Sequence, residues 1–340
     1  MFEKLNLQLF AAPDLTTDVP TPVNKTTNNT TGSNDLSPEM KTFYDTALIR
    51  LAEPDLIYDR FGQKRPIPQG NGKTIEFRKF DSLPKNTTAL TEGVTPTGRQ
   101  LNVTAKTATV AQYGDYVATS DVLQLTAIDP IVSETTRILA SQAARTSDTI
   151  TRDIIMAGTN VIYSHGTSRA SVTDSYPITL DLIRDARLQL RRNNAPTIDG
   201  SYICILHPDV ARDLRGLQGF LDIVQYGDPD RVYDGEIGKI EGVRFFETTE
   251  APIWKTGTAP NQTTAYGCLF LGADAYGVTD VNGGGLRMIV KNLGSAGAAD
   301  PLDQRSTIGW KLIKTAIRLV EEYMVRVECG ASNGSNAQAN

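Results

Sequence analysis

The hydrophobic and polar positions alternate most clearly between residues 63 and 117, where they predict an extended β-hairpin. The first strand, at about 73–80, reads TIEFRKF over its last seven positions and alternates Ile75 and Phe77 with charged residues. The second strand, at about 101–117, alternates mainly threonine, valine and alanine. Both faces of this hairpin therefore carry little apolar bulk.

The connection between these strands, residues 81–100, has no periodicity and contains two prolines and two glycines. A loop this long inside a compact domain is unusual, and such loops are typically functional or mobile. An isolated two-stranded hairpin is marginally stable in water. We therefore expect the hairpin to be ordered by lying on another surface.

Two segments repeat apolar residues every three or four positions and predict helices. The first, near 38–52, begins with a serine cap and a proline at the first helical position. The second, over 129–158, begins with Asp129 and Pro130 and stops at Gly158. At 1.5 Å per residue the second helix is about 40 Å long, which is more than a small domain needs.

Residues 178–264 have the pattern of a compact α/β unit. Thr179 caps an amphipathic helix, SYICIL at 201–206 is a buried strand, and a second helix starts at His207. The rest of the chain is rich in short strands, and YMVRVEC at 323–329 alternates as a half-buried antiparallel strand does. The fold class predicted from these elements is α+β.

Composition and charge narrow the range of possible functions. The chain has 340 residues and a net charge of −5, so it lacks the global basic field of a nucleic-acid-binding protein. No apolar run is long enough for a membrane helix, and the N-terminus lacks the pattern of a signal peptide, so we expect a protein made in the cytoplasm.

Residues 1–36 are rich in proline, threonine and asparagine and are expected to be disordered. We expect the three cysteines, Cys204, Cys268 and Cys329, to be buried free thiols.

The sequence contains no convincing catalytic or cofactor site. Residues 72–74 read GKT but lack the earlier glycine of a phosphate-binding loop, and His165 and His207 have no identifiable catalytic partners. The remaining candidate is an acidic cluster that consists of Asp228, Asp230, Asp234 and Glu236. Its spacing does not fit a calcium loop. A solvated loop or a subunit-contact loop is favoured for it, and weak cation binding stays open.

Several stretches in a fixed order carry a family resemblance. They are GKTIEFRKFDSLP, LTEGVTPTGRQL, TATVAQYGDYVATSDVLQLTAIDPIV, GTNVIYS, HPDVARDLR, GEIGKIEGVRFFET, and GSAGAADPLDQRSTIGWK followed by YMVRVE. Over roughly residues 40–330 the chain resembles tailed-bacteriophage major capsid proteins with the Hong Kong 97-type fold. The N-terminal LNLQLFA resembles capsid proteins from phages of Gram-positive hosts.

The resemblance implies a division of the chain into five parts. These are an N-terminal arm at 1–62, an extended hairpin loop at 63–117, a peripheral domain at 118–177 and 265–330 with a long spine helix, an α/β axial domain at 178–264, and a flexible tail at 331–340. It also implies a non-enzymatic protein without cofactors or bound metal. Hexamers and pentamers of the chain would form an icosahedral shell around double-stranded DNA.

The resemblance further implies partners and contact residues. The partners are further copies of the chain, a separate scaffold protein and a portal, with packaged DNA contacted weakly and non-specifically and no membrane involved. Assembly would take place in the host cytoplasm and give a virion capsid. The side chains expected at subunit contacts are Ile75, Phe77, Phe80, Glu92, Arg99, Tyr113, Asp228, Asp230, Arg231, Asp234 and Glu236.

Two other functions stay open at this point. An encapsulin-like bacterial compartment shell would use the same fold with an enzyme cargo. A cytoplasmic enzyme with residues 81–100 as a lid would need convergent titratable groups near that loop. The only such groups there are Asp81, Lys85, Glu92 and Arg99.

Overall fold

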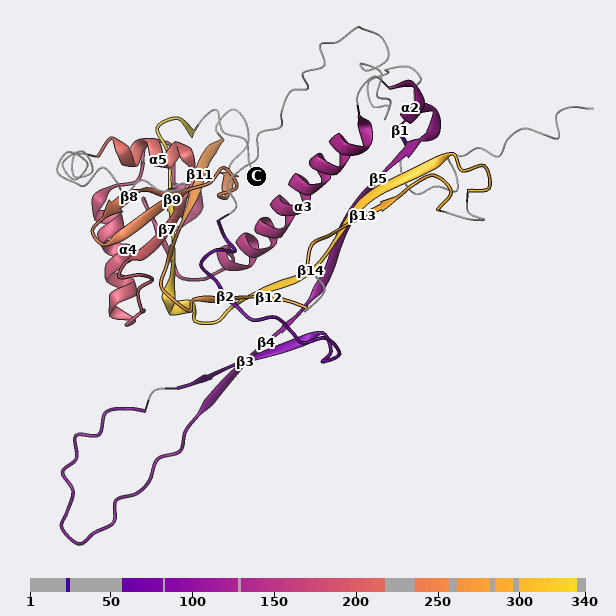
Figure 1. The fold of residues 1–340 in the computed structure, drawn as a ribbon. Coiled ribbons are helices and arrows are strands. Elements are labelled where there is room, and N and C mark those ends of the chain that lie inside the picture. Colours follow the sequence, from indigo (N-terminus) through magenta and orange to yellow (C-terminus); the bar gives the residue numbers. More distant parts are fainter. Residues whose placement is uncertain are drawn as a thin grey trace, which may run out of the picture. The chain divides into compact units, whose positions relative to one another are not determined.

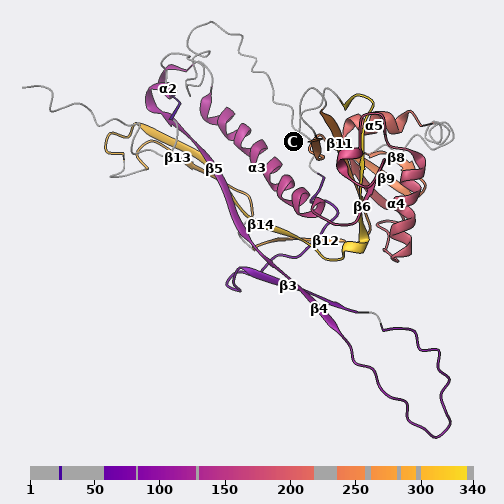
Figure 2. The same cartoon turned by 180° about the vertical axis from the view of Figure 1, so that it is seen from behind.

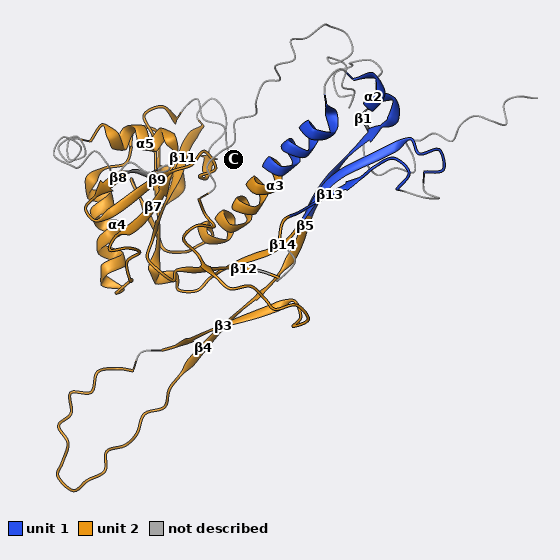
Figure 3. Ribbon diagram, in the orientation of Figure 1, with its two compact units in different colours: residues 1–51, 114–141, 287–311 blue, residues 52–113, 142–286, 312–340 orange. Residues whose placement is uncertain are grey.

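The computed structural model (Figure 1) describes residues 23–24, 57–81, 83–127, 130–217, 236–256, 262–281, 285–295 and 300–334. The chain divides into two compact units (Figure 3). The first contains residues 1–51, 114–141 and 287–311, and the second contains residues 52–113, 142–286 and 312–340. Helix α3 (Ile131–Met156) and strands β5 (Ala111–Ser120) and β14 (Arg305–Arg318) each have residues in both units.

The second unit is built on a mixed seven-stranded sheet. Its strands follow the order β6 (Val161–Tyr163), β15 (Met324–Cys329), β11 (Thr263–Leu271), β7 (Tyr202–Leu206), β9 (Val243–Glu247) and β8 (Glu236–Ile240), and β10 (Ile253–Thr256) pairs with β11. The pairs β7–β9 and β6–β15 are parallel. The pairs of β11 with β7, β10 and β15 are antiparallel, as is β8–β9.

Both faces of this sheet are covered. Helices α4 (Leu180–Arg192) and α5 (Pro208–Arg215) lie against one face, as Figures 1 and 2 both show. Cys204 and Leu206 of β7 point into the core on that side, while Ile203 and Ile205 point into a second core. The second core is completed by Ile57, Tyr58, Ile155, Met156 and Tyr276.

The local signals for α4 and α5 are confirmed. The Thr179 hydroxyl accepts a hydrogen bond from the Leu182 N–H at 3.3 Å. The His207 Nδ1 accepts one from the Asp209 N–H at 3.2 Å, and Pro208 occupies the first turn. Each contact satisfies one of the free N–H groups at a helix start, which is why these residues set the boundaries. The described part of this unit also contains two short 3₁₀ helices, η2 (Arg169–Ser171) and η5 (Glu321–Tyr323).

Strand β15 differs from the prediction. The alternation at 323–329 predicted a half-buried strand, but every residue of β15 is buried except the half-buried Arg326. Glu328 is fully buried and is bound by the guanidinium groups of Arg169 and Arg326. The strand is an interior strand of the sheet, between β6 and β11, so its charged positions are paired inside the protein.

The predicted hairpin is present, with one correction. Strand β3 (Thr74–Phe80) pairs antiparallel with β4 (Val103–Thr109). The expected second strand at 101–117 is in fact β4 followed by β5, with Val110 between them. The Val110 N–H donates to the Lys73 carbonyl at 2.9 Å and closes the hairpin, after which the chain enters another sheet. Small residues alternate through this boundary, so the sequence pattern shows no break there.

That other sheet has six strands. Their order is β1 (Val23–Asn24), β5, β14, β12 (Tyr276–Asp280) and β2 (Gln63–Lys64), and β13 (Arg287–Lys291) pairs with β14. Within the first unit, β5 and β14 approach closely, because a Cβ on Gly309 would lie 2.9 Å from the Asp115 carbonyl oxygen.

Among the described residues of the first unit, α2 and α3 are helical. Helix α2 (Asp121–Thr126), which the sequence pattern did not predict, is capped by the Ser120 hydroxyl. Helix α3 confirms the long helix predicted over 129–158, to within two residues at each end. In the described part of the chain, no helix is both long and apolar enough to cross a membrane.

The strand pairing also differs from the expected division into domains. The boundary predicted at residue 265 falls inside β11, and β11 and β15 share one sheet with β7. The predicted tail begins too early, because Ala331 is buried and the Ser332 N–H donates to the Asp213 carboxylate at 2.7 Å. The predicted disordered segment at 1–36 and the helix near 38–52 lie outside the described residues, apart from 23–24.

Candidate functional site

Both histidine side chains make packing or capping contacts. The imidazole of His165 stacks on the Tyr176 ring with 3.9 Å between centroids. His207 caps α5 and lies 3.2 Å from the Asp209 carboxylate. Burial lowers the pKa of His207, and the adjacent Asp209 opposes that shift. These contacts account for His165 as a stacked side chain and for His207 as a helix cap.

The cysteines and potential metal ligands give no catalytic arrangement either. Cys204, Cys268 and Cys329 are buried and free, as predicted. A hydrogen bond with Cys268 and burial raise the pKa of the Cys329 thiol, and burial raises that of Cys204. Thiols in this state are poor nucleophiles. Within the described ranges no three His, Cys, Asp or Glu side chains are grouped to bind a metal ion.

The β3–β4 hairpin of the second unit is largely exposed, and its base is docked on other strands of that unit. The Phe77 ring lies over Gly277 of β12, where an added Cβ would be only 3.0 Å from the ring. The Lys106 ammonium donates to the Arg318 carbonyl of β14 at 3.3 Å, and the Lys79 ammonium lies 6.0 Å from the centre of the Tyr323 ring. These contacts fix the base of the hairpin, in strands β3 and β4, to its own subunit.

A groove of about 630 Å³ runs along the docked part of the hairpin. One wall is formed by the hairpin and the other by the segment that links β14 to η5. Its lining mixes apolar and charged side chains: Gln63, Arg65, Ile75, Phe77, Lys79, Lys106, Asp274, Leu319, Glu321 and Glu322. Ile75 and Phe77, which we predicted at subunit contacts, are half-buried in this groove, and their contact with another copy stays a prediction.

Beyond the two strands the hairpin continues as a loop. Every described residue from 83 to 102 is exposed and has neither helix nor strand structure. The Asp81 carboxylate accepts from the Thr104 hydroxyl at 3.1 Å, and the Asp81 N–H donates to the Asn102 carbonyl, so ordered pairing ends there. The loop and the adjoining strand ends expose six large apolar side chains: Phe80, Leu83, Leu90, Val94, Leu101 and Val103.

The other predicted contact residues lie in three places. Phe80 is 67% exposed, Glu92 and Arg99 are exposed on the loop, and Tyr113 is half-buried on β5. The acidic segment with Asp228, Asp230, Arg231 and Asp234 lies outside the described residues. Glu236 is the first residue of β8. Their part in subunit contacts stays a prediction.

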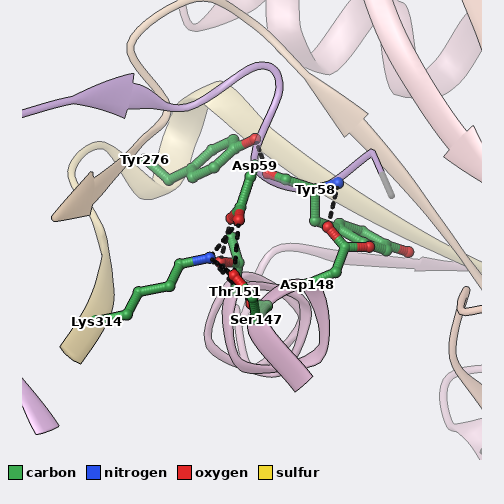
Figure 4. Close-up of polar contacts among 7 residues, drawn as sticks. All are labelled: Tyr58, Asp59, Ser147, Asp148, Thr151, Tyr276 and Lys314. Carbon is green, nitrogen blue, oxygen red and sulfur yellow. Dashed lines mark hydrogen bonds and ion pairs between the residues drawn. The ribbon is translucent and has the colours of Figure 1, made fainter. Parts of the chain in front are cut away.

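Sequence reasoning missed a polar cluster within the second unit that fixes residues 57–59 to α3 and β14 (Figure 4). Asp59 forms an ion pair with Lys314 of β14 and accepts from the Thr151 hydroxyl of α3 at 2.6 Å. The Lys314 ammonium also donates to the Ser147 carbonyl oxygen at 3.0 Å. Lys314 and Asp59 are 255 residues apart, so no local motif joins them.

Residues 103–322 match the family model described as phage capsid protein. The chain belongs to the phage capsid protein family. The match confirms the prediction that the chain is a bacteriophage major capsid protein, which is a structural protein. No curated protein sequence matches this capsid protein.

Solved capsid structures share the fold of this capsid protein at low sequence identity. The capsid of Ralstonia phage GP4 is 14% identical with a TM-score of 0.67, over 92% of this chain and 100% of that one. The capsid of the cyanophage P-SCSP1u is 15% identical with a TM-score of 0.65, over 88% and 95%. The head of Helicobacter pylori bacteriophage KHP40 is 12% identical with a TM-score of 0.64, over 91% and 100%.

Proposed function

We propose that this capsid protein assembles into hexamers and pentamers of an icosahedral shell that encloses double-stranded DNA, with the Hong Kong 97-type arrangement of its parts. The observation that carries the proposal is the β3–β4 hairpin, whose loop exposes apolar side chains that no part of the described subunit covers. In the shell, residues 81–102 lie over a neighbouring copy.

The energetics of this loop favour an intermolecular contact. Fully burying a large apolar side chain stabilises by about 1.5–3 kcal/mol, so half-burying the six listed above contributes roughly 6 kcal/mol per subunit. Ordering the loop and associating two subunits offset part of that gain. The remaining weak interaction, repeated at every subunit, gives the collective stability of a closed shell.

The other parts of the proposal rest on the family and on charge. Residues 178–264, with the acidic segment at 228–236, would meet their copies around the shell's rotation axes. A separate scaffold protein and a portal would take part in assembly in the host cytoplasm. The net charge of −5 suits a container that holds DNA without binding its phosphates tightly.

Substitution within the loop tests the proposal. The triple variant Leu90→Ser, Val94→Ser and Leu101→Ser removes apolar contacts without shortening the loop. The matched control changes the neighbouring polar residues Thr87, Thr88 and Thr95 to serine. Each protein is co-expressed with its neighbouring genes and analysed by sedimentation velocity and negative-stain microscopy.

The control is expected to form megadalton hollow particles of uniform diameter. The apolar-to-serine variant is expected to remain a folded 37.0 kDa subunit, with the circular dichroism of the control. Uniform shells from this variant at the yield of the control would contradict the proposed role of the loop. A control that also fails to assemble would contradict a specific role for its apolar residues.

A further inference from the structure

Residues 57–59 of the second unit lie against a buried carboxylate, Asp148 of α3. Its Oδ1 accepts a hydrogen bond from the Tyr58 N–H at 2.9 Å. The Tyr58 carbonyl accepts from the Tyr276 hydroxyl of β12 at 2.5 Å, and the Tyr58 side chain is fully buried. Figure 4 shows Tyr58 held between α3 on one side and Tyr276 on the other. Residues 1–56 precede this attachment.

The charge on Asp148 has no direct counter-charge. Its side chain is almost fully buried, and its Oδ2 has no hydrogen-bond partner among the described residues. The one ammonium in the cluster, that of Lys314, contacts Asp59 and Ser147 and not Asp148. The ionisable groups that interact with Asp148 are Tyr58 and Asp59 of residues 57–59, Tyr276 of β12 and Lys314 of β14. The charge of Arg152 of α3 acts on Tyr58.

These surroundings favour the protonated form of Asp148. Burial, and then the negative charge of Asp59, raise the pKa of Asp148 from 3.8 to about 6, while the backbone N–H groups of Tyr58 and Ile57 and the charge of Lys314 oppose the shift. A protonated Asp148 still accepts the Tyr58 N–H through its carbonyl oxygen. It leaves Asp59 and Lys314 as a neutral pair, whereas an ionised Asp148 adds an uncompensated buried charge.

We propose that Asp148, Tyr58, Asp59 and Lys314 form a proton-sensitive latch, which holds residues 57–59 more tightly when Asp148 is protonated than when it is ionised. Asp148 binds the proton more strongly while residues 57–59 are attached than when they are released and Asp148 is solvated. The free energy of release is therefore greatest at low pH, falls as the pH rises toward 6, and is constant above it. This property of the subunit goes beyond the proposed shell and does not depend on it.

Hydrogen exchange of the full-length chain tests the latch. Exchange is followed by mass spectrometry in a peptide that covers residues 57–61, between pH 5 and 7.5, after correction for intrinsic rates. With a pKa of about 6 attached and 3.8 released, the protection is expected to be about tenfold lower at pH 7.5 than at pH 5. A peptide from β7 is the internal reference and is expected to keep constant protection.

Two variants separate Asp148 from other carboxylates. Asp148→Asn, which is uncharged at every pH, is expected to abolish the pH dependence in 57–61. Asp185→Asn, which removes an exposed carboxylate on α4, is expected to keep the tenfold change. Constant wild-type protection over this range overturns the latch, as does a tenfold change that persists in Asp148→Asn. If Asp148→Asn does not fold, the pH profile of the wild-type protein alone decides whether the latch exists. The test does not depend on whether any variant forms shells.

Discussion

The buried carboxylate of Glu328 gives the sharpest stability prediction. It lies on β15, an interior strand of the seven-stranded sheet, and has no solvent exposure. Its two oxygens accept from the Arg169 Nε and a terminal nitrogen of that guanidinium, each at 2.7 Å, and Arg326 Nε lies 2.8 Å away. The Arg169 guanidinium in turn stacks 3.6 Å from the centre of the Trp254 ring. Replacing Glu328 with alanine leaves two arginines without their counter-charge.

The magnitude follows from these contacts. Removing one partner of a buried ion pair typically costs about 3–5 kcal/mol. Glu328→Ala is therefore expected to destabilise the subunit by about 4 kcal/mol, which lowers its Tm by roughly 10 °C. Glu328→Gln keeps the shape and one acceptor oxygen, so it is expected to cost less, about 2 kcal/mol.

Urea unfolding of unassembled subunits, followed by tryptophan fluorescence, measures these changes. The matched control is Glu322→Ala, which removes an exposed carboxylate from the same segment and is expected to change stability by less than about 0.5 kcal/mol. A loss below about 1 kcal/mol for Glu328→Ala would refute the reasoning, because it would show that the arginines do not need this carboxylate.

Three further substitutions test other parts of the structure. His207→Ala removes the cap of α5 and should cost about 1 kcal/mol in urea unfolding; unchanged stability would show that the cap is dispensable. Phe77→Ala removes the ring that lies over Gly277, so amide exchange in residues 74–80 should rise while that of β7 stays constant; equal exchange in both proteins would contradict docking of the hairpin base. Lys314→Met should destabilise by about 3–5 kcal/mol at pH 8 and by less at pH 5, where Asp148 is protonated; the opposite order in thermal denaturation would reverse the charge argument.

The elements that could be predicted from the sequence are those with local signals. Helices α3, α4 and α5 have apolar residues at helical spacing, and the last two also have capping residues at their starts. The buried strand β7 is a continuous apolar run. These signals depend on residues within a few positions of each other, so a single sequence contains them.

The features that could not be predicted depend on distant residues. Glu328 is buried because Arg169, 159 residues earlier, reaches it, whereas the sequence pattern alone placed it on a solvent face. The pairing of Asp59 with Lys314 spans most of the chain. The alternation at Ile75 and Phe77 revealed an apolar face of the hairpin but not that their own subunit half-buries it.

Cryo-electron microscopy of assembled particles tests the central claim most directly, since it locates residues 81–102 in the shell. We expect density for this loop to lie on a neighbouring copy, with Leu90, Val94 and Leu101 buried at that contact. A loop that is folded back on its own subunit, or that extends into solvent without contacting another copy, would contradict the account.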